Sequence, residues 1–147
     1  MSRFATLNSN TDFRRAYGRG KAYTNPALVT YVVKNRAGIC RIGITTSKKI
    51  GNAVERNRAR RVIREAYRTH MNNLQGGFDI VFVARTKTVH KKSTDISAIM
   101  RKHLITAGVI KDVEESGYGD YPILPEIHLP SFRAEMQILS DLFPLYF

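Results

Sequence analysis

Residues 47–68 constrain the fold more than any other stretch, because they combine a helical period with a high density of arginine. At about 100° per residue, their apolar side chains fall on one face of a helix, and His70 extends that face. An amphipathic helix is stable only when another element covers its apolar side. We therefore expect a helix that packs on a core through Ala59, Val62, Ile63, Ala66, Tyr67 and His70.

The polar side of the same helix carries four arginines and an asparagine that point in similar directions. Only Glu55 and Glu65 could balance them, and only Arg61 and Glu65 have good spacing for an ion pair. A solvated basic face is the simpler interpretation. The excess charge favours an external polyanion, because guanidinium binds phosphate with two hydrogen bonds and stacks on bases. We therefore predict an RNA- or DNA-binding face made of Asn57, Arg60, Arg61, Arg64 and Arg68.

The net charge of +12 is unevenly distributed over the 147 residues. Residues 1–110 carry 22 Lys and Arg against 5 Asp and Glu, which gives +17, whereas residues 111–147 carry 2 against 7, which gives −5. The positive field attracts polyanions, and an anionic membrane would also be attracted. However, the apolar face of the helix is modest and contains two alanines, unlike that of a membrane-surface helix. We therefore expect nucleic acid as the partner, and no membrane.

Few residue types suggest catalysis or metal binding. Cys40 is the single cysteine, which excludes an intrachain disulfide and a thiolate zinc cluster. The carboxylates of residues 1–110 belong to separate predicted elements, and no phosphate-binding loop is found. Neither a membrane span nor a signal-type run is found. We expect a cytoplasmic binding protein without a metal site, without catalytic residues and without a stable protein partner. The histidines also lack a metal-binding spacing; they are His70, His90, His103 and His128.

Periodicity and turn signals predict the order α-β-β-α-β-α. The short connection at residues 35–38 predicts that the first two strands pair as an antiparallel hairpin. The fold class is therefore α+β, a single-domain sandwich of a mixed sheet with helices packed on one face. That domain spans residues 1–110, and residues 111–147 form an acidic, proline-containing extension of unknown role. The elements are a helix at 8–18, strands at 23–34 and 39–46, the basic helix, a strand at 78–84 and a helix at 95–108.

Aromatic residues in the first helix suggest a second surface. Phe13 and Tyr17 are four residues apart and share a helix face. They either pack under the sheet or, with the nearby Lys21, form a platform on which bases of a single strand stack. The strand at 39–46 alternates apolar residues with a more polar set, so one of its faces can meet a ligand. The polar set is Arg41, Gly43, Thr45 and Ser47.

The basic stretch resembles the protein subunit of bacterial ribonuclease P. The resemblance covers about residues 3–108 and rests on the spacing of Lys48-Lys49-Ile50-Gly51-Asn52-Ala53-Val54, Arg56-Asn57-Arg58, Arg60-Arg61, Arg64-Glu65 and Arg68. The Arg56-Asn57-Arg58 group corresponds to the RNR motif of that family. Surrounding residues fit as well, namely Asp12-Phe13, Tyr17, Tyr31, Phe78-Asp79-Ile80-Val81 and Ala84-Arg85.

The resemblance implies a protein that assists a catalytic RNA in removing the 5′ leader from precursor tRNA. It also implies that magnesium ions act at the RNA, and that the fold contains a left-handed β-α-β crossover. The implied contacts with the RNA subunit are Lys48, Lys49, Arg56, Asn57, Arg58, Arg60, Arg61, Arg64 and Arg68. The implied leader-binding residues, in a cleft between the sheet and the first helix, are Phe13, Tyr17, Tyr31, Thr45 and Lys49.

Two implied assignments conflict with simple geometry. Arg58 falls off the basic arc of the helix, so we expect it to bind peripherally or to pair with Glu55 or Glu65. Tyr31 shares a strand face with valines, which is also typical of a core residue.

The acidic extension and the function each leave alternatives open. The extension departs from the family pattern and is either a loosely attached segment, a competitor of RNA for the basic helix, or a contact to another molecule. Two other functions fit the composition in part. They are a structural RNA-binding protein of ribosomal type and an autonomous protein nuclease, which the missing carboxylate cluster disfavours.

Overall fold

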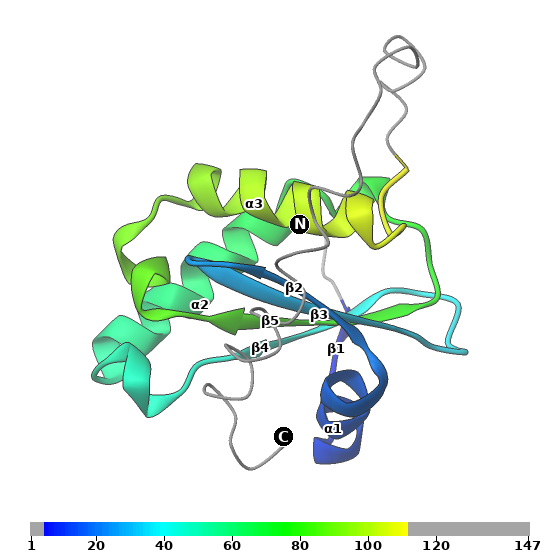
Figure 1. The fold of residues 1–147 in the computed structure, drawn as a ribbon, viewed down its shortest axis with the longest axis horizontal. Coiled ribbons are helices and arrows are strands. Elements are labelled where there is room, and N and C mark those ends of the chain that lie inside the picture. Colours follow the sequence, from blue (N-terminus) through cyan, green and yellow to red (C-terminus); the bar gives the residue numbers. More distant parts are fainter. Residues whose placement is uncertain (1–4, 112–147) are drawn as a thin grey trace, which may run out of the picture.

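The computed structural model describes residues 5–111, which form a five-stranded sheet and three α-helices (Figure 1). The strands are β1 (Ala5–Thr6), β2 (Lys21–Asn25), β3 (Leu28–Lys34), β4 (Arg41–Thr45) and β5 (Phe78–Ala84). The α-helices are α1 (Asn10–Arg19), α2 (Ala53–Arg68) and α3 (Ser93–Thr106), and the short 3-10 helices are η1 (Lys48–Ile50), η2 (Met71–Asn73) and η3 (Thr86–His90). The predicted α+β class with a mixed sheet is confirmed. The predicted extension lies outside the described residues, apart from Lys111.

The order of the strands in the sheet is β1-β4-β5-β3-β2. β5 lies between β3 and β4, antiparallel to β3 and parallel to β4. The predicted hairpin between β3 and β4 is therefore wrong, although the two strands run in opposite directions. Apart from Asp79, the residues of β5 are apolar on both faces, which suits a central strand that is covered on both sides.

The predicted strand at 23–34 is in fact a hairpin of β2 and β3. Pro26 lacks an amide hydrogen, and the side chain of Asn25 accepts a hydrogen bond from the amide of Ala27 at 2.9 Å. Asn25 and Pro26 therefore form a turn. The sequence prediction missed this turn because residues with high strand propensity flank it on both sides.

Helices cover both faces of the sheet, so the prediction that they pack on one face is wrong. Figure 1 shows α2 and α3 above the sheet and α1 below it. Alternate residues of β5 serve the two layers: Ile80 and Phe82 pack in the core with α2 and α3, and Val81 and Val83 pack in the core with α1. On α1, the buried residues Ala16 and Tyr17 face the sheet and form this second core together with residues of the strands.

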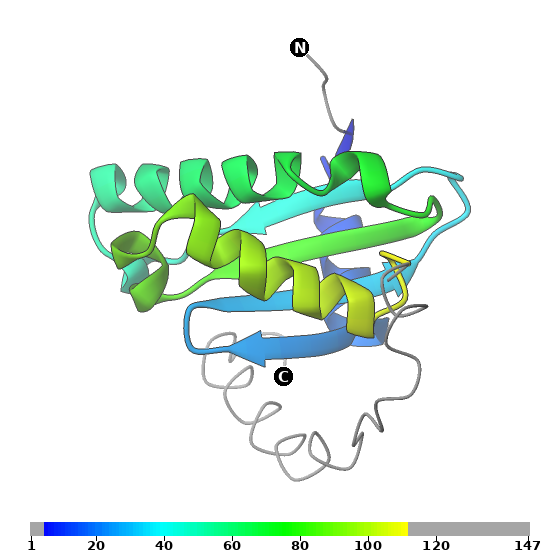
Figure 2. The same ribbon diagram turned by 90° about the horizontal axis from the view of Figure 1, so that it is seen from above.

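The connection from β4 through α2 to β5 joins two parallel neighbours. Figure 2 looks onto the sheet from the side of α2, and both arrows point to the left with β5 below β4. This arrangement is a left-handed crossover, as the resemblance implies and against the usual right-handed preference.

The helix α2 forms where the periodicity predicts it. Asn52 accepts a hydrogen bond from the amide of Glu55 at 2.9 Å, and Glu55 accepts one from the amide of Asn52 at 3.1 Å, which makes a capping box. Every member of the predicted apolar face is buried, including Tyr67 and His70. None of the helices that residues 5–111 form is long and apolar enough to cross a membrane.

Candidate nucleic-acid interface

The basic side of α2 faces away from the core. Asn57, Arg61, Arg64 and Arg68 are exposed, and Arg60 is half-buried beside the sheet edge. Burial of the opposite, apolar side fixes the rotation of the helix and therefore the direction of these side chains. Glu55 uses its carboxylate in the capping box at the start of the helix. Within the described part of the chain, Arg60, Arg61 and Arg64 form no ion pair, so their charge is available to a ligand.

The two arginines of the RNR group have structural contacts. Arg56 donates from Nη1 to the carbonyl oxygen of Gly51 at 2.9 Å. Arg58 donates from Nε to the carbonyl oxygen of Val89 in η3, also at 2.9 Å. The expected pairing of Arg58 with Glu55 or Glu65 is therefore wrong, because the side chain reaches toward η3. That Arg58 binds RNA at the periphery of the arginine arc stays a prediction.

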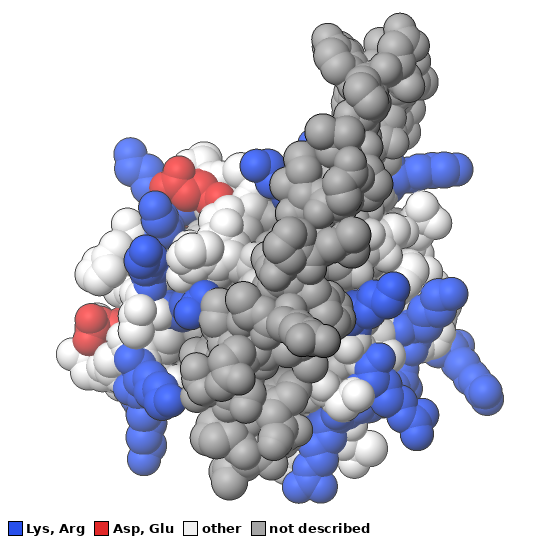
Figure 3. Space-filling view, viewed as in Figure 1, with Lys and Arg blue, Asp and Glu red and all other residues white. Residues whose placement is uncertain are grey.

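The residues before α2 form a basic turn. Lys48 and Lys49 are exposed on η1, which follows directly after β4, while the neighbouring Ile50 is buried and anchors the turn to the core. Figure 3 shows Lys and Arg gathered at the end of the molecule where η1 and the start of α2 lie in Figure 1, and again over the region of α1 and the β3–β4 connection. Basic side chains therefore gather at both ends of the face that Figure 3 shows.

Four of the five predicted leader-binding residues meet between α1 and the sheet. The hydroxyl groups of Tyr17 and Thr45 are 2.6 Å apart, and the rings of Tyr17 and Tyr31 pack edge to face with centroids 4.9 Å apart. Phe13 lies beside Tyr17, with ring centroids 6.4 Å apart. Lys49 lies on η1, away from this cluster along the chain.

Exposure divides this cluster into an outer and an inner part. Phe13 is half-buried, whereas Tyr17 and Tyr31 are only 6% and 1% exposed. The core interpretation of Tyr31 is confirmed by its packing with Val29 and Val81. Its ring has no free face for a base in this structure, so Phe13 is the aromatic residue best placed for stacking.

Phe13 lies directly on β4, at a point where only glycine fits. A Cβ atom at Gly43 would lie 2.5 Å from the ring of Phe13. β1 pairs with β4 only at Arg41 and Ile42, so the strand edge beyond Ile42 is open. A cavity of about 160 Å³ lies at this open edge, and Phe13, Gly43, Ile44, Arg60 and Arg64 are among the residues that line it. The aromatic cluster and the arginine face of α2 therefore meet at one edge of the sheet, although they lie on opposite faces.

The sequence prediction missed an ion-pair network between α1 and the sheet, centred on the buried Asp79. Asp79 on β5 is fully buried and accepts two hydrogen bonds from Arg41, each at 2.8 Å. Asn35 donates a third at 2.6 Å, and Arg15 lies 3.6 Å from the same carboxylate. The parallel register, which pairs Arg41 with Asp79, brings the two charges together. The available signal was one acid in the otherwise apolar run of residues 78–84.

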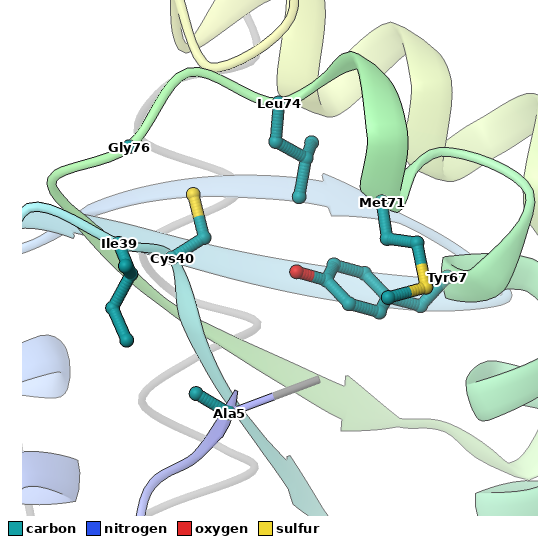
Figure 4. Close-up of a pocket in the computed structure, with 7 residues that line it drawn as sticks. All are labelled: Ala5, Ile39, Cys40, Tyr67, Met71, Leu74 and Gly76. Carbon is teal, nitrogen blue, oxygen red and sulfur yellow. The ribbon is translucent and has the colours of Figure 1, made fainter. Parts of the chain in front are cut away.

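The remaining candidates for chemistry are structural. Burial raises the pKa of the Cys40 thiol, which disfavours the reactive thiolate. Cys40 lines an apolar cavity of about 410 Å³ with Tyr67, Met71 and Leu74 (Figure 4). Residues 5–111 contain no group of three His, Cys, Asp or Glu side chains that could hold a metal ion.

Comparison with known proteins decides the family. Residues 1–108 match the family described as Ribonuclease P. The chain belongs to the ribonuclease P protein family. The ribonuclease P protein component of Clostridium botulinum is 41% identical over 104 residues, which cover 70% of this chain and 94% of the relative. The ribonuclease P protein component of Clostridioides difficile is 43% identical over 97 residues, which cover 65% of this chain and 85% of the relative.

Solved structures of ribonuclease P proteins share the fold. The protein from Staphylococcus aureus matches with a TM-score of 0.65 at 32% identity, over 74% of this chain and all of that one. The protein from Thermotoga maritima matches with a TM-score of 0.61 at 28% identity, and the match covers 67% of this chain and 94% of that protein. The protein is thus a subunit of the ribonucleoprotein that matures the 5′ end of tRNA, and it works with ribonuclease P RNA and precursor tRNA.

Proposed function

We propose that the protein uses two surfaces in this enzyme: the arginine face of α2 binds the RNA subunit, and the cleft at Phe13 and Tyr17 binds the 5′ leader. The observation that carries the proposal is the cavity at the open edge of β4, where Phe13 meets Arg60 and Arg64. A single strand that enters there can stack a base on Phe13 while an arginine holds its phosphate.

The two surfaces recognise RNA in different ways. The α2 face offers charge, from Arg60, Arg61, Arg64 and Arg68, with Asn57 as a hydrogen-bonding group. Lys48 and Lys49 extend that charge along η1, and Arg56 and Arg58 brace the start of α2 through carbonyl contacts. Such contacts depend on phosphates and therefore on salt.

The leader cleft offers a ring and a supported hydroxyl group. We assign base stacking to Phe13, and a hydrogen bond from the Tyr17–Thr45 pair to a nucleotide at the cleft mouth. Tyr31 supports Tyr17 from the core side through the edge-to-face contact. Lys49 would meet the phosphate of a nucleotide that leaves the cleft toward η1.

Magnesium is expected at the RNA subunit, where the bond is cleaved. The contribution of the protein is to hold the leader and the RNA subunit together, which raises the fraction of time that the scissile bond lies at the active site. We propose the bacterial cytoplasm as its place of action, because tRNA precursors are made there.

Reconstitution tests the proposal. Purified protein, a bacterial ribonuclease P RNA and precursor tRNA are combined at low magnesium, and each component is omitted in turn. Cleavage at the mature 5′ end should require the RNA and should be stimulated by the protein. Cleavage by the protein alone would overturn the division of labour proposed here.

A further inference from the structure

A second basic cavity lies on the other flank of α1 from Phe13 and Tyr17. It has a volume of about 580 Å³ and lies between α1 and the connection from β3 to β4. Five cationic side chains line it: Arg15, Arg19, Lys34, Arg36 and Arg41. We call it the α1 basic pocket. None of these residues belongs to the arginine face of α2 or to the aromatic cluster.

The α1 basic pocket keeps a positive charge after its internal ion pairs are counted. Asp79 is bound by Arg41 and approached by Arg15, and Asp12 lies 3.8 Å from Arg41. Two carboxylates against five cations leave a net charge of +3. Arg19, Lys34 and Arg36 are exposed, so the surplus charge faces solvent.

The inner wall of the pocket is built in advance. Arg41 is held by the two hydrogen bonds to Asp79, and Arg15 donates to the carbonyl oxygen of Lys34. The side chains of Arg15 and Arg41 remain 34% and 28% exposed. Asn35 fixes the turn that carries Arg36, because its side chain accepts from the amide of Ala37 at 2.9 Å and donates to Asp79. A ligand therefore meets guanidinium groups that are already ordered, which lowers the entropy cost of binding.

The lining also defines the class of ligand. Among the residues that the structure describes, no aromatic side chain lines the cavity, so stacking of bases on residues 5–111 is not its main interaction. The cavity combines hydrogen-bonded arginines with exposed cations. This combination suits a chain of phosphates, because arginine binds a phosphate with two hydrogen bonds. The RNA subunit is the less suitable source, since the α2 face that we assign to it lies on the opposite side of the sheet (Figure 1). A strand that lies against Phe13, by contrast, needs only to cross α1 to reach Arg19.

We propose that the α1 basic pocket binds phosphates of the 5′ leader upstream of the nucleotides held at Phe13. This inference rests on the proposed leader cleft and extends it to a second, sequence-independent subsite across α1. It predicts that affinity grows with leader length beyond what the cleft alone can hold.

The test measures binding of precursor tRNA to the reconstituted holoenzyme as the leader is lengthened one nucleotide at a time. The variant is Arg19→Ala with Arg36→Ala, two exposed residues outside the Asp79 network. The control is Lys102→Ala with Lys111→Ala, which removes the same charge from exposed positions outside α1 and the β3–β4 connection. Thermal unfolding of both variants checks the fold.

The variant should bind short-leader substrate like the native protein and long-leader substrate on the order of tenfold more weakly. Its salt dependence with long leaders should flatten by roughly 1.4, since each phosphate on a single strand contributes about 0.7 to the slope. A loss that is equal at every leader length, or no loss at any length, would overturn the pocket as a leader subsite. A different result would contradict the proposed leader cleft itself: with native protein, even a short leader would not raise the affinity for precursor tRNA.

Discussion

The helices α1 and α2 both present cations next to apolar packing, but the two basic surfaces are built differently. On α2, the arginines come from one helix and project from a face opposite the core, with no ion pairs at Arg60, Arg61 and Arg64 within the described residues. At α1, two cations converge on the buried Asp79: Arg15 from the helix and Arg41 from β4. The comparison teaches that Arg60, Arg61 and Arg64 make no ion pair that stabilises residues 5–111, whereas Arg15 and Arg41 do.

Replacing Asp79 should have the largest effect and should act on stability. Asp79→Ala leaves Arg41 without its buried partner, and loss of one member of a buried pair costs about 3–5 kcal/mol. The partial exposure of Arg41 favours the lower end of this range. Chemical denaturation measures the loss. Glu65→Gln, at an exposed position on α2, is the control and should change the unfolding free energy by less than about 0.5 kcal/mol. Equal small effects in both variants would contradict a structural role for the α1 charges.

Acid should destabilise the protein through His103, in the layer that α2 and α3 share. Nδ1 of His103 lies 2.8 Å from the hydroxyl oxygen of the buried Thr30, and burial lowers the pKa of His103 to about 4. In the unfolded chain the imidazole has a pKa of about 6.5, so it binds a proton more readily there. Stability should therefore fall as the pH decreases from about 6.5 to 4, by about 3 kcal/mol in total.

Unfolding measured across that pH range checks this prediction. His103→Gln should flatten the dependence, and His90→Gln, at an exposed position, should leave it unchanged. Some slope should remain from His70, since burial lowers its pKa as well. A dependence that is as steep in His103→Gln as in the native protein would show that His103 is not the responsible group.

Removing Arg60 and Arg64 together should weaken binding to the RNA subunit by about a hundredfold at low salt, without loss of stability. Both side chains line the open edge of β4 and form no ion pair within residues 5–111. The slope of log affinity against log salt should flatten. Arg58→Ala is the matched comparison, because its Nε already donates to Val89, and it should weaken binding much less. An unchanged slope in the double variant would refute phosphate binding by these arginines.

The smallest expected effect concerns the hydroxyl pair at the cleft. Tyr17→Phe removes the 2.6 Å contact with Thr45 and should cost about 0.5–1.5 kcal/mol of stability. Its ring packing on Tyr31 is retained, so stacking at Phe13 should persist. Thr45→Val serves as the second arm of a double-mutant cycle. Additive losses in that cycle would show that the two hydroxyl groups are not coupled.

The contrast between α1 and α2 also explains what the sequence could predict. The buried and exposed sides of α2 follow from a single helical period, so Ala59, Ile63 and Arg64 could be assigned from spacing alone. The pairing of β5 between β3 and β4 could not, because a short turn at residues 35–38 permits a hairpin and nothing local excludes it. The placement of α1 on the opposite face of the sheet from α2 and α3 could not be predicted either, because it also depends on the strand order.

The site divides in the same way. The arginines of α2 and the shared face of Phe13 and Tyr17 are local patterns. The network of Arg15, Arg41 and Asp79 joins residues far apart in the chain, through a parallel register that exists only once the sheet has formed. Such non-local sites require the topology. The leader-binding role of Tyr31 came from family resemblance, and the structure shows its ring covered by Tyr17 and the core.

The most direct test of the two-surface account is the preference of the holoenzyme for precursor tRNA over mature tRNA. Phe13→Leu keeps an apolar side chain over Gly43 and removes the stacking ring, and Phe13→Tyr restores a ring. Phe13→Leu should lower the affinity for precursor tRNA by roughly tenfold, or about 1–3 kcal/mol per lost stacked base, while mature tRNA binds as before. Phe13→Tyr should recover most of the preference. An undiminished preference for precursor tRNA in Phe13→Leu would contradict the account.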